Sequence, residues 1–295
     1  MPLVAQLVVD ALKANSVKHV FALSGDQILS VFECLRNSGI ELIHTRHEAA
    51  AVHMADAYGR LTGKPGVALV TAGPGHCNTM SALLSANKAE SPVVLLSGAS
   101  SLSLRGQGDF QEIDQADIAR SVTKAAWYAE DPVNLAQDVT RALKLATHGR
   151  PGTVSLSLPT DLLLQDLSRI QAKPPTPLSV TLPPTPKADD TSLQKIVQML
   201  NEAKNPFIIC GPAMTRGECW KICKKLQEIT QIPVIPSQSA RGVYDPELRR
   251  VPQLFGKADV VLLLGKQLDF TLQFGQKKAF AETCRFVQIS VDQRF

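Results

Sequence analysis

The sequence predicts an α/β protein made of two doubly wound parallel-sheet domains. Short apolar runs rich in Val, Ile and Leu alternate with amphipathic stretches along most of the 295 residues, a pattern typical of parallel strands covered by helices on both faces. A proline-rich segment interrupts this alternation at residues 171–190, and the length suits about two domains of roughly 100–200 residues each. We therefore expect one domain at residues 1–170 and a second at residues 191–295, joined by a stiff, extended connector.

The first domain has the more regular alternation. Helices are predicted where apolar residues recur every three or four positions, and strands where they run together. The predicted helices are residues 4–15, 28–37, 48–61, 77–89 and 132–147. The predicted strands are residues 19–23, 41–44, 67–71, 93–97 and 153–158. Gly39 and Gly63 end two of the helices, and residues 100–117 are expected to form a looser segment.

The second domain repeats the pattern over a shorter length. Its predicted helices are residues 192–203 and 219–230, and its predicted strands are residues 206–210, 234–236, 260–265 and 286–291. The series predicts a second, smaller α/β domain.

Composition argues for a folded globular protein and against nucleic-acid-binding and membrane-spanning proteins. Hydrophobic residues make up 44% of the chain and charged residues 20%, which is enough for a sizeable core. The net charge of +4 is modest, and its Lys and Arg residues are scattered, so no nucleic-acid partner is expected. No apolar run approaches the roughly 20 residues of a membrane helix.

The predicted compartment is the cytoplasm. The N-terminus has neither the basic start nor the long apolar run of a secretory signal. The six cysteines contain no CxxC pair, which favours free thiols over zinc ligands or disulfides.

Candidate binding residues lie in the loops that follow the first three strands. In open parallel sheets, ligands bind beyond the carboxyl ends of the strands. These loops are residues 24–27 (SGDQ), 45–48 (TRHE) and 72–78 (AGPGHCN). Gly73 and Gly75 flank Pro74, so the backbone there can bend sharply and approach a flat ligand closely.

Glu48 is the main candidate for chemistry, and its residue type leaves two interpretations open. A carboxylate at a helix start is stabilised by the helix dipole by about 0.3–1 kcal/mol. Alternatively, the small residues 49–51 (AAA) let another layer pack closely, which would dry the carboxylate, raise its pKa and suit it to proton transfer.

Several short strings, in their order and spacing, carry a family resemblance. They are residues 46–51 (RHEAAA), 54–60 (MADAYGR), 71–75 (TAGPG) with Asn78, 110–115 (FQEIDQ), 150–154 (RPGTV), 158–161 (LPTD) and 206–211 (PFIICG). Together they resemble the pyrimidine-binding and middle domains of acetolactate synthase-type thiamine-diphosphate enzymes. That family includes oxalyl-CoA decarboxylase, 2-hydroxyacyl-CoA lyase and pyruvate oxidase relatives.

The resemblance implies a mechanism and a set of cofactor-binding residues. The glutamate that matches Glu48 hydrogen-bonds the pyrimidine ring and favours the tautomer whose nitrogen takes the thiazolium C2 proton. The thiazolium then serves as the electron sink for loss of carbon dioxide or for C–C cleavage. Gly73, Pro74 and Asn78 match the segment that lines the pyrimidine pocket, although the same residues also suit a simple strand-to-helix turn.

Further residues are implied near the substrate. Gln111, preceded by Phe110, matches a position that faces the reacting groups in acetolactate synthases; the alternative is a solvated loop amide. Gly25 lies where the family places a loop near the substrate, and Asp26 replaces a glycine expected in acetolactate synthases, which leaves the substrate open.

Two histidines flank the predicted pocket in the sequence. His47 precedes Glu48 and His76 follows Gly75. A single histidine in such a position is more often structural than catalytic.

The resemblance also implies a diphosphate-binding motif and a metal site that this sequence does not contain. The family holds the cofactor diphosphate through Mg²⁺ on a Gly-Asp-Gly motif in a third, C-terminal domain. The Gly25-Asp26 and Gly108-Asp109 pairs lack the following glycine, so no metal site is expected here and the diphosphate domain is expected to be absent. The middle domain is expected to be incomplete, because its strand at residues 258–262 arrives early, and this shortening argues against an FAD site.

The function expected from these observations is that of an acetolactate synthase-like, thiamine-diphosphate-dependent lyase or carboligase acting on 2-oxo acids. The alternatives are a fragment of the 2-hydroxyacyl-CoA lyase or oxalyl-CoA decarboxylase type, which would act on an acyl-CoA, and a non-catalytic interaction module. Because family sites form between two chains, the expected partner is a second copy of the chain or a diphosphate-domain chain, and the isolated chain is expected to be inactive.

Overall fold

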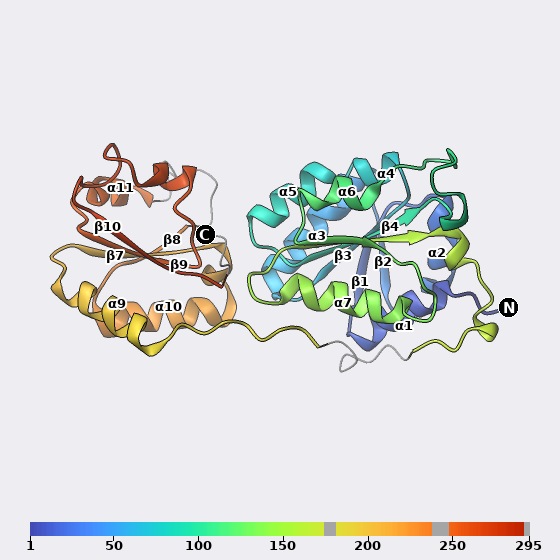
Figure 1. Cartoon of the computed structure of the whole chain (residues 1–295), viewed down its shortest axis with the longest axis horizontal. Helices are drawn as coiled ribbons and strands as arrows, with labels where there is room; N and C mark the ends of the chain where they lie inside the picture. Colours follow the sequence, from blue (N-terminus) through green and yellow to red (C-terminus); the bar gives the residue numbers. More distant parts are fainter. Residues whose placement is uncertain (174–180, 238–247, 292–295) are drawn as a thin grey trace. The chain divides into compact units, whose positions relative to one another are not determined.

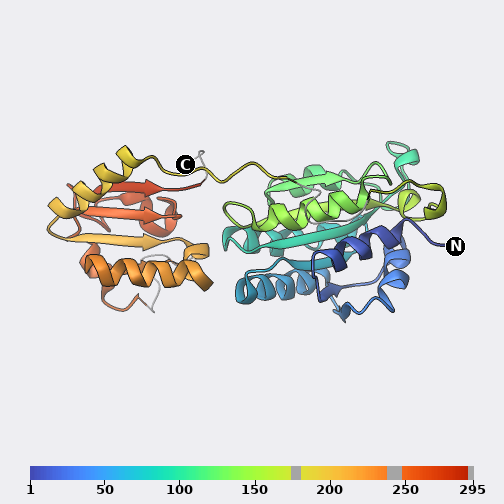
Figure 2. The same cartoon turned by 90° about the horizontal axis from the view of Figure 1, so that it is seen from below.

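The computed structural model describes residues 1–173, 181–237 and 248–291. The chain forms two compact units, Met1–Pro183 and Pro184–Phe295, each built on a parallel sheet (Figures 1 and 2). The predicted fold class, two α/β parallel-sheet domains, is confirmed. Part of the predicted connector, residues 174–180, lies outside the described residues. Within the described ranges, no helix is both long and apolar enough to cross a bilayer.

The first unit contains a six-stranded sheet in the order β2-β1-β3-β4-β6-β5, with every pair parallel. The strands are β1 (His19–Ala22), β2 (Glu41–His44), β3 (Gly66–Val70), β4 (Val93–Ala99), β5 (Ala125–Tyr128) and β6 (Thr153–Pro159). The chain passes from β1 outward to β2 and then returns to β3 on the other side of β1. The strand order therefore reverses between β1 and β3, which is where open α/β sheets bind ligands.

Helices cover both faces of this sheet. The longer ones are α1 (Ala5–Ala14), α2 (Leu29–Leu35), α3 (Glu48–Thr62), α5 (Met80–Lys88) and α7 (Leu135–Thr147). Short helical segments are η1 (Asp26–Ile28), α4 (Pro74–Cys77), η2 (Leu102–Leu104), α6 (Gln115–Arg120), α8 (Thr160–Leu163) and η3 (Leu167–Arg169). Figure 1 shows α1 and α7 side by side on one face, and α3, α5 and α6 on the other.

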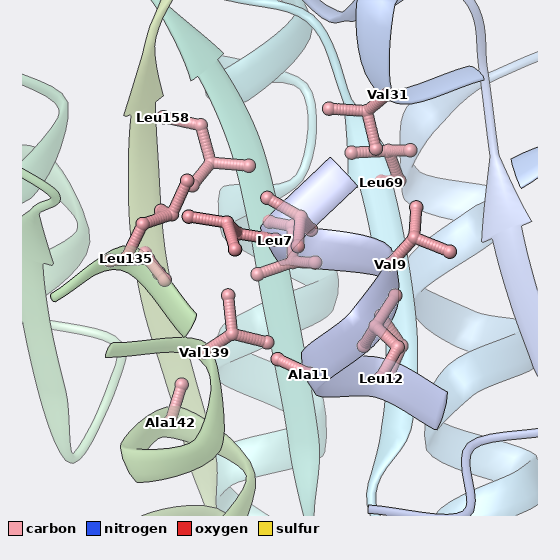
Figure 3. Packing of buried hydrophobic residues seen from close by; sticks show 14 of the residues in the cluster. Leu7, Val9, Ala11, Leu12, Val31, Leu69, Leu135, Val139, Ala142 and Leu158 are labelled. Atoms are coloured by element: carbon pink, nitrogen blue, oxygen red, sulfur yellow. The ribbon is translucent and has the colours of Figure 1, made fainter. Parts of the chain in front are cut away.

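Alternation along the strands divides the core into two layers. On β3, Leu69 packs with the cluster that contains α1 and α7, whereas Ala68 and Val70 pack with the cluster that contains α3 and α5. In Figure 3, Leu7 of α1 and Leu135 of α7 lie over the sheet among other apolar side chains. Burial of each such Leu or Val contributes about 1.5–3 kcal/mol, so the helix faces that carry these residues are held against the sheet.

Three parts of the first unit differ from the prediction. The predicted loose segment 100–117 contains η2 and the start of α6, and β5 was not predicted at all. β5 is an edge strand of half-buried residues that begins with two alanines, and alanine has weak strand propensity. The predicted helix 77–89 begins later, as α5, because Cys77 belongs to the separate turn α4 that Pro74 starts, and the Thr79 hydroxyl bonds back to the His76 carbonyl at 2.6 Å.

The second unit contains a four-stranded parallel sheet in the order β10-β9-β7-β8. Its strands are β7 (Pro206–Cys210), β8 (Val234–Pro236), β9 (Val260–Leu264) and β10 (Arg285–Ile289). Its helical elements are α9 (Asp190–Glu202), η5 (Pro212–Thr215), α10 (Gly217–Thr230), α11 (Val251–Phe255) and η8 (Phe270–Gly275). Figure 1 shows α9 and α10 on one face and α11 on the other.

The α11 side of this sheet is held by aromatic packing. Phe255 of α11 stacks on Phe280 with ring centroids 5.2 Å apart, and Phe280 meets Phe286 of β10 edge-on at 5.0 Å. α11 is too short to show a helical period, which explains why it was not predicted. Residues 238–242, which precede the strand that was expected to arrive early, lie outside the described residues.

Replacement of Gly66 by alanine tests how closely α3 packs on β3. A Cβ at Gly66 would lie 2.0 Å from the Ala55 carbonyl oxygen of α3, so the helix backbone must shift. We expect Gly66→Ala to lower the free energy of unfolding by about 2–3 kcal/mol, measured by urea denaturation. The control Gly256→Ala adds a methyl group whose nearest neighbour, the Gln253 carbonyl oxygen, is 4.0 Å away; equal losses in both variants would contradict close α3–β3 packing.

Candidate functional site

The candidate site lies at the carboxyl ends of β1, β2 and β3. Glu48 is the first residue of α3, which follows β2, and Asn78 ends α4, which follows β3. The Asn78 amide Nδ2 donates to Glu48 Oε2 at 3.0 Å, across 30 residues of sequence. Glu48 is half-buried and Asn78 is exposed, so the pair lies at the surface of the described part of this unit.

His47 has a structural role in positioning Glu48. Its backbone is extended, and its ring Nδ1 accepts a hydrogen bond from the Ala49 backbone N–H at 3.1 Å. This bond caps the first turn of α3 and satisfies one of the amides that a helix N-terminus leaves without a partner. The ring therefore fixes the direction in which α3, and with it Glu48, leaves β2.

Glycines surround the side chain of Thr71, which follows β3. A Cβ at Gly25 would lie 2.4 Å from Thr71 Cβ, and a Cβ at Gly75 would lie 2.7 Å from Thr71 Cγ2 and 3.4 Å from Glu48 Oε1. The Thr71 hydroxyl donates to the Gln27 side-chain oxygen. The loops after β1 and β3 therefore meet around one threonine, whose methyl group lies where a side chain at Gly75 would have to go, next to the Glu48 carboxylate.

Gln111 reaches the same loop from a distant part of the sequence. Its backbone φ of 59° lies in the left-handed region. A Cβ added to Gly73 would lie 2.7 Å from the Gln111 Cβ and 2.8 Å from the Gln111 carbonyl oxygen, so the two residues are in close contact. Gly73 itself has φ 55°, and Pro74 follows it as the exposed first residue of α4. Within the described residues, the buried Gln111 Oε1 has no hydrogen-bond partner.

The loop that carries Gln111 is held by carboxylates. Glu112 accepts hydrogen bonds from the backbone N–H groups of Gly106, Gly108 and Asp109. These bonds, that from Gly106 above all, hold the pKa of the Glu112 carboxyl below its usual range. At the base of the loop, Asp161 accepts from the Leu102 N–H at 2.9 Å and from Ser103.

Gln115 connects this loop to the loop after β3, and sequence reasoning missed it. Its side-chain oxygen accepts from the Gly73 N–H at 3.0 Å, and its side-chain amide donates to the Gly98 carbonyl at 2.9 Å. Its backbone carbonyl lies 3.0 Å from His76 Nε2, and its N–H donates to the Tyr128 hydroxyl at 2.8 Å. No local pattern marks this glutamine, because its partners come from four other segments.

His76 is fully buried and its ring is held at both nitrogens. Nε2 lies 3.0 Å from the Gln115 carbonyl, and Nδ1 lies 3.0 Å from the Ser97 hydroxyl. A carbonyl only accepts, so Nε2 carries the proton and Nδ1 is the acceptor of the neutral ring. Burial lowers the pKa of His76 from 6.5 to about 4. His76 is thus a neutral structural group, as expected for most single histidines.

The carboxylate of the Gly108-Asp109 pair has a structural role in its own loop. Asp109 accepts hydrogen bonds from the Ser101 and Phe110 N–H groups, so both of its oxygens hold the loop. In the described parts of the chain, no group of three or more His, Cys, Asp or Glu side chains is arranged to hold a metal ion.

The polar groups at the strand reversal suit a hydrogen-bonding ring better than an ion. One carboxylate oxygen of Glu48 accepts a hydrogen bond from Asn78, and the other lies 3.4 Å from the place of a Cβ on Gly75. The Gln111 side-chain oxygen, which has no hydrogen-bond partner among the described residues, belongs to the residue that packs on Gly73. A pyrimidine that donates and accepts at its ring edge suits these groups. The fold and these residues define a doubly wound α/β protein whose candidate polar groups gather where the strand order reverses.

Comparison with known families agrees with this class. Residues 3–118 match the N-terminal TPP binding domain of thiamine pyrophosphate enzymes, and residues 193–295 match the central domain of the same enzymes. The chain belongs to the thiamine pyrophosphate enzyme family.

Individual relatives have different activities. The chain is 34% identical over 276 residues to acetolactate synthase of Bacillus subtilis (strain 168), covering 92% of this chain and 47% of that protein. It is 30% identical over 300 residues to oxalyl-CoA decarboxylase of Escherichia coli (strain K12), covering 97% and 52%. It is 31% identical over 296 residues to 2-hydroxyacyl-CoA lyase of Arabidopsis thaliana, covering 97% and 52%. The chain spans about half the length of these relatives.

A pH dependence of stability follows from His76. Its pKa is 6.5 unperturbed and about 4 in the folded chain, so below pH 6.5 the unfolded chain binds a proton that the folded chain does not. Stability from this group is present above pH 6.5 and is lost as the pH falls toward 4, by about 3 kcal/mol. We expect His76→Asn to reduce the difference in unfolding free energy between pH 7 and pH 4 by that amount.

The matched control for this prediction is His53→Asn, which changes an exposed histidine of α3. It should retain the full pH dependence in urea titrations at both pH values. If the difference in unfolding free energy between pH 7 and pH 4 is the same in His76→Asn as in the unsubstituted chain, other groups cause the acid sensitivity.

Replacement of Glu112 by glutamine tests the hold on the Gln111 loop. The substitution replaces one of the accepting oxygens with an NH₂ group that cannot accept. We expect the amides of Gly108 and Asp109 to exchange hydrogen severalfold faster, measured by NMR or mass spectrometry. Glu33→Gln, which changes an exposed residue of α2, is the control and should leave the exchange rates of these amides unchanged. If the amides exchange as slowly in Glu112→Gln as in the unsubstituted chain, the loop is held by its other contacts.

Proposed function

We propose that the first unit binds the pyrimidine ring of thiamine diphosphate and that Glu48 is the acid that exchanges a proton with that ring. The observation that carries the proposal is the Glu48 carboxylate, held by Asn78 at the strand reversal beside the side-chain-free face of Gly75. Membership of the thiamine pyrophosphate enzyme family supports it.

Within this proposal, the two oxygens of Glu48 have different tasks. Oε2 accepts from the Asn78 amide, which fixes the plane of the carboxyl group. Oε1 lies beside Gly75 and is the atom that holds or releases the proton. Asn78 can only donate to Oε2 through its NH₂, so it favours the placement of the proton on Oε1.

Other residues bind and orient rather than transfer protons. Gly73 and Gly75 keep the backbone close to the ring, and Pro74 fixes the bend between them. The Gln111 carboxamide, with a buried oxygen that has no partner among the described residues, orients a polar group of the substrate or cofactor. Gly25 lets the loop after β1 approach Thr71 and places Asp26 at the rim of the site.

We propose that the complete enzyme is an acetolactate synthase-like lyase or carboligase that acts on 2-oxo acids. Bound thiamine diphosphate would supply the electron sink for loss of carbon dioxide or for cleavage next to a carbonyl. The identities to acetolactate synthase and to the acyl-CoA enzymes differ little. Asp26, a carboxylate where acetolactate synthases are expected to have glycine, leaves the substrate open, so the acyl-CoA enzymes remain the second candidate.

We propose further that the diphosphate and its Mg²⁺ are held by another domain, from a second copy of the protein or a partner chain in the cytoplasm. The family models support this, because the parts of the chain that they match are the N-terminal and the central domains. Phe110, which precedes Gln111, is 65% exposed and is available for contact with a covering domain.

The first test is calorimetric titration of the chain with thiamine diphosphate and Mg²⁺, alone and with a chain that carries the diphosphate domain. We expect tight binding and turnover of a 2-oxo acid only in the mixture. Tight binding by the chain alone would contradict the assignment of the diphosphate site to another domain, and no binding in either case would support a non-catalytic interaction module.

The second test is the Glu48→Gln substitution in the reconstituted enzyme. A carboxamide in place of the carboxyl group cannot exchange a proton, so we expect the rate of exchange of the cofactor C2 proton, followed by NMR, to fall at least about 100-fold, with the cofactor affinity changed only severalfold. Glu33→Gln is the control with unchanged exchange. Normal C2 exchange in Glu48→Gln would refute the proposed role.

A further inference from the structure

Two cysteines of the second unit are in direct contact. Cys210 is the last residue of β7, and Cys223 lies in the middle of α10, which covers that face of the sheet. Their Sγ atoms are 3.3 Å apart. Both residues are buried, with 0% and 1% of their surface exposed, and both are free thiols.

The surroundings keep these thiols uncharged. Ile208, Val234 and Leu262 pack in the same cluster, and burial is the main cause that raises the pKa of both cysteines. The Cys223 sulfur also lies 3.6 Å from the Met214 carbonyl. A pair of neutral thiols in contact is stable without further chemistry. Among the described residues, no third His, Cys, Asp or Glu side chain joins the two cysteines to form a metal site.

We propose that Cys210 and Cys223 form a redox site, an oxidisable thiol pair that closes to an intramolecular disulfide when the protein meets a peroxide. The sulfur atoms need to approach by about 1.3 Å to reach the S–S bond length of about 2.05 Å. This is within the reach of side-chain rotation combined with a small shift of α10.

The oxidation balances with hydrogen peroxide as the two-electron oxidant. One thiol attacks the peroxide, its sulfur takes an OH group and one water leaves. The second thiol then attacks that sulfenic sulfur, the S–S bond forms and a second water leaves. Two S–H bonds and one O–O bond are broken, and two electrons pass from the sulfurs to the peroxide oxygens.

The oxidant reaches the pair through the exposed side of α10. Cys219, one turn before Cys223, is exposed, and Ile222 is 64% exposed. Local opening of this half of the helix uncovers Cys223. Because the raised pKa values keep the thiolate fraction low, the pair is expected to react with peroxide more slowly than an exposed thiol such as Cys219.

The disulfide would join a helix to the sheet that it covers. It would close a short loop between β7 and α10, with the two cysteines 13 positions apart. Closing a loop of this size restricts the unfolded chain. Cys210 also directly precedes Gly211, where a Cβ would lie 2.2 Å from the Gly265 carbonyl oxygen, so the crosslink would stiffen the carboxyl edge of the second sheet.

The sequence makes the test direct, because trypsin separates the three cysteines of this region into different peptides. Cleavage after Lys204, Arg216, Lys221 and Lys224 gives peptides 205–216 with Cys210, 217–221 with Cys219 and 222–224 with Cys223. The reduced chain is treated with hydrogen peroxide, quenched, unfolded in the presence of iodoacetamide and digested. We expect peptides 205–216 and 222–224 to be joined with the loss of two hydrogen atoms, and to separate after reduction.

Variants and stability provide the second measurement. Oxidation should raise the thermal unfolding midpoint of the second unit by on the order of 10 °C, and dithiothreitol should reverse the rise. Cys210→Ser and Cys223→Ser should abolish both the crosslink and the rise. The matched control Cys219→Ser, on the same helix, should retain both.

Peptide mapping of the unsubstituted chain decides the proposal even if a serine variant folds poorly. Full alkylation of Cys210 and Cys223, even when peroxide treatment is extended well beyond complete oxidation of exposed Cys219 and Cys77, would overturn it and leave the pair as ordinary packing. A dominant crosslink between 217–221 and 222–224 would also overturn it, because Cys219 would then be the partner of Cys223.

Discussion

Close backbone approach around Thr71 is the constraint on which the candidate site depends. The loops after β1 and β3 meet there because neither Gly25 nor Gly75 carries a side chain, and a Cβ at either position would lie within 2.7 Å of the threonine. Glu48 Oε1 lies beside the same packing, 3.4 Å from the place of a Cβ on Gly75. Strand order reverses between β1 and β3, so the geometry that places these loops together is a property of the whole sheet and not of any one loop.

A layer of buried polar groups supports the loops that carry the candidate site. Gln115 joins the Gly73 backbone to Gly98, and its own backbone is bonded to His76 and Tyr128. A buried polar group without a hydrogen-bond partner costs stability. The folded state therefore favours the arrangement of this layer in which its groups are hydrogen-bonded to one another. The layer therefore fixes the position of Gly73, and through Gly73 the position of Gln111, without any of these supporting residues needing to touch a ligand.

The local sequence predicted most of the fold but only part of the site. Strands and helices with a clear period were found within a few residues, whereas β5 and α11 were missed because the first is a half-buried edge strand and the second is a single short helix. The motif around Glu48 and Gly73 was assigned to the carboxyl ends of the strands, which is where the structure places both residues. Gln115 and Thr71 could not be assigned supporting roles, because their contacts join segments that are 42 and 44 residues apart.

The sequence by itself determined the alternation of helix and strand, the two-domain layout and the residue types available at each strand end, because these depend on local periodicity and composition. Only the tertiary structure decided that Asn78 binds Glu48, that Gln111 lies against Gly73, that His76 is buried and neutral, and that Cys210 meets Cys223. The physical reason is that each of these pairs is brought together by the packing of helices on a sheet. Contacts between side chains that are distant in the sequence depend on strand order and helix placement, which no short stretch of residues specifies alone.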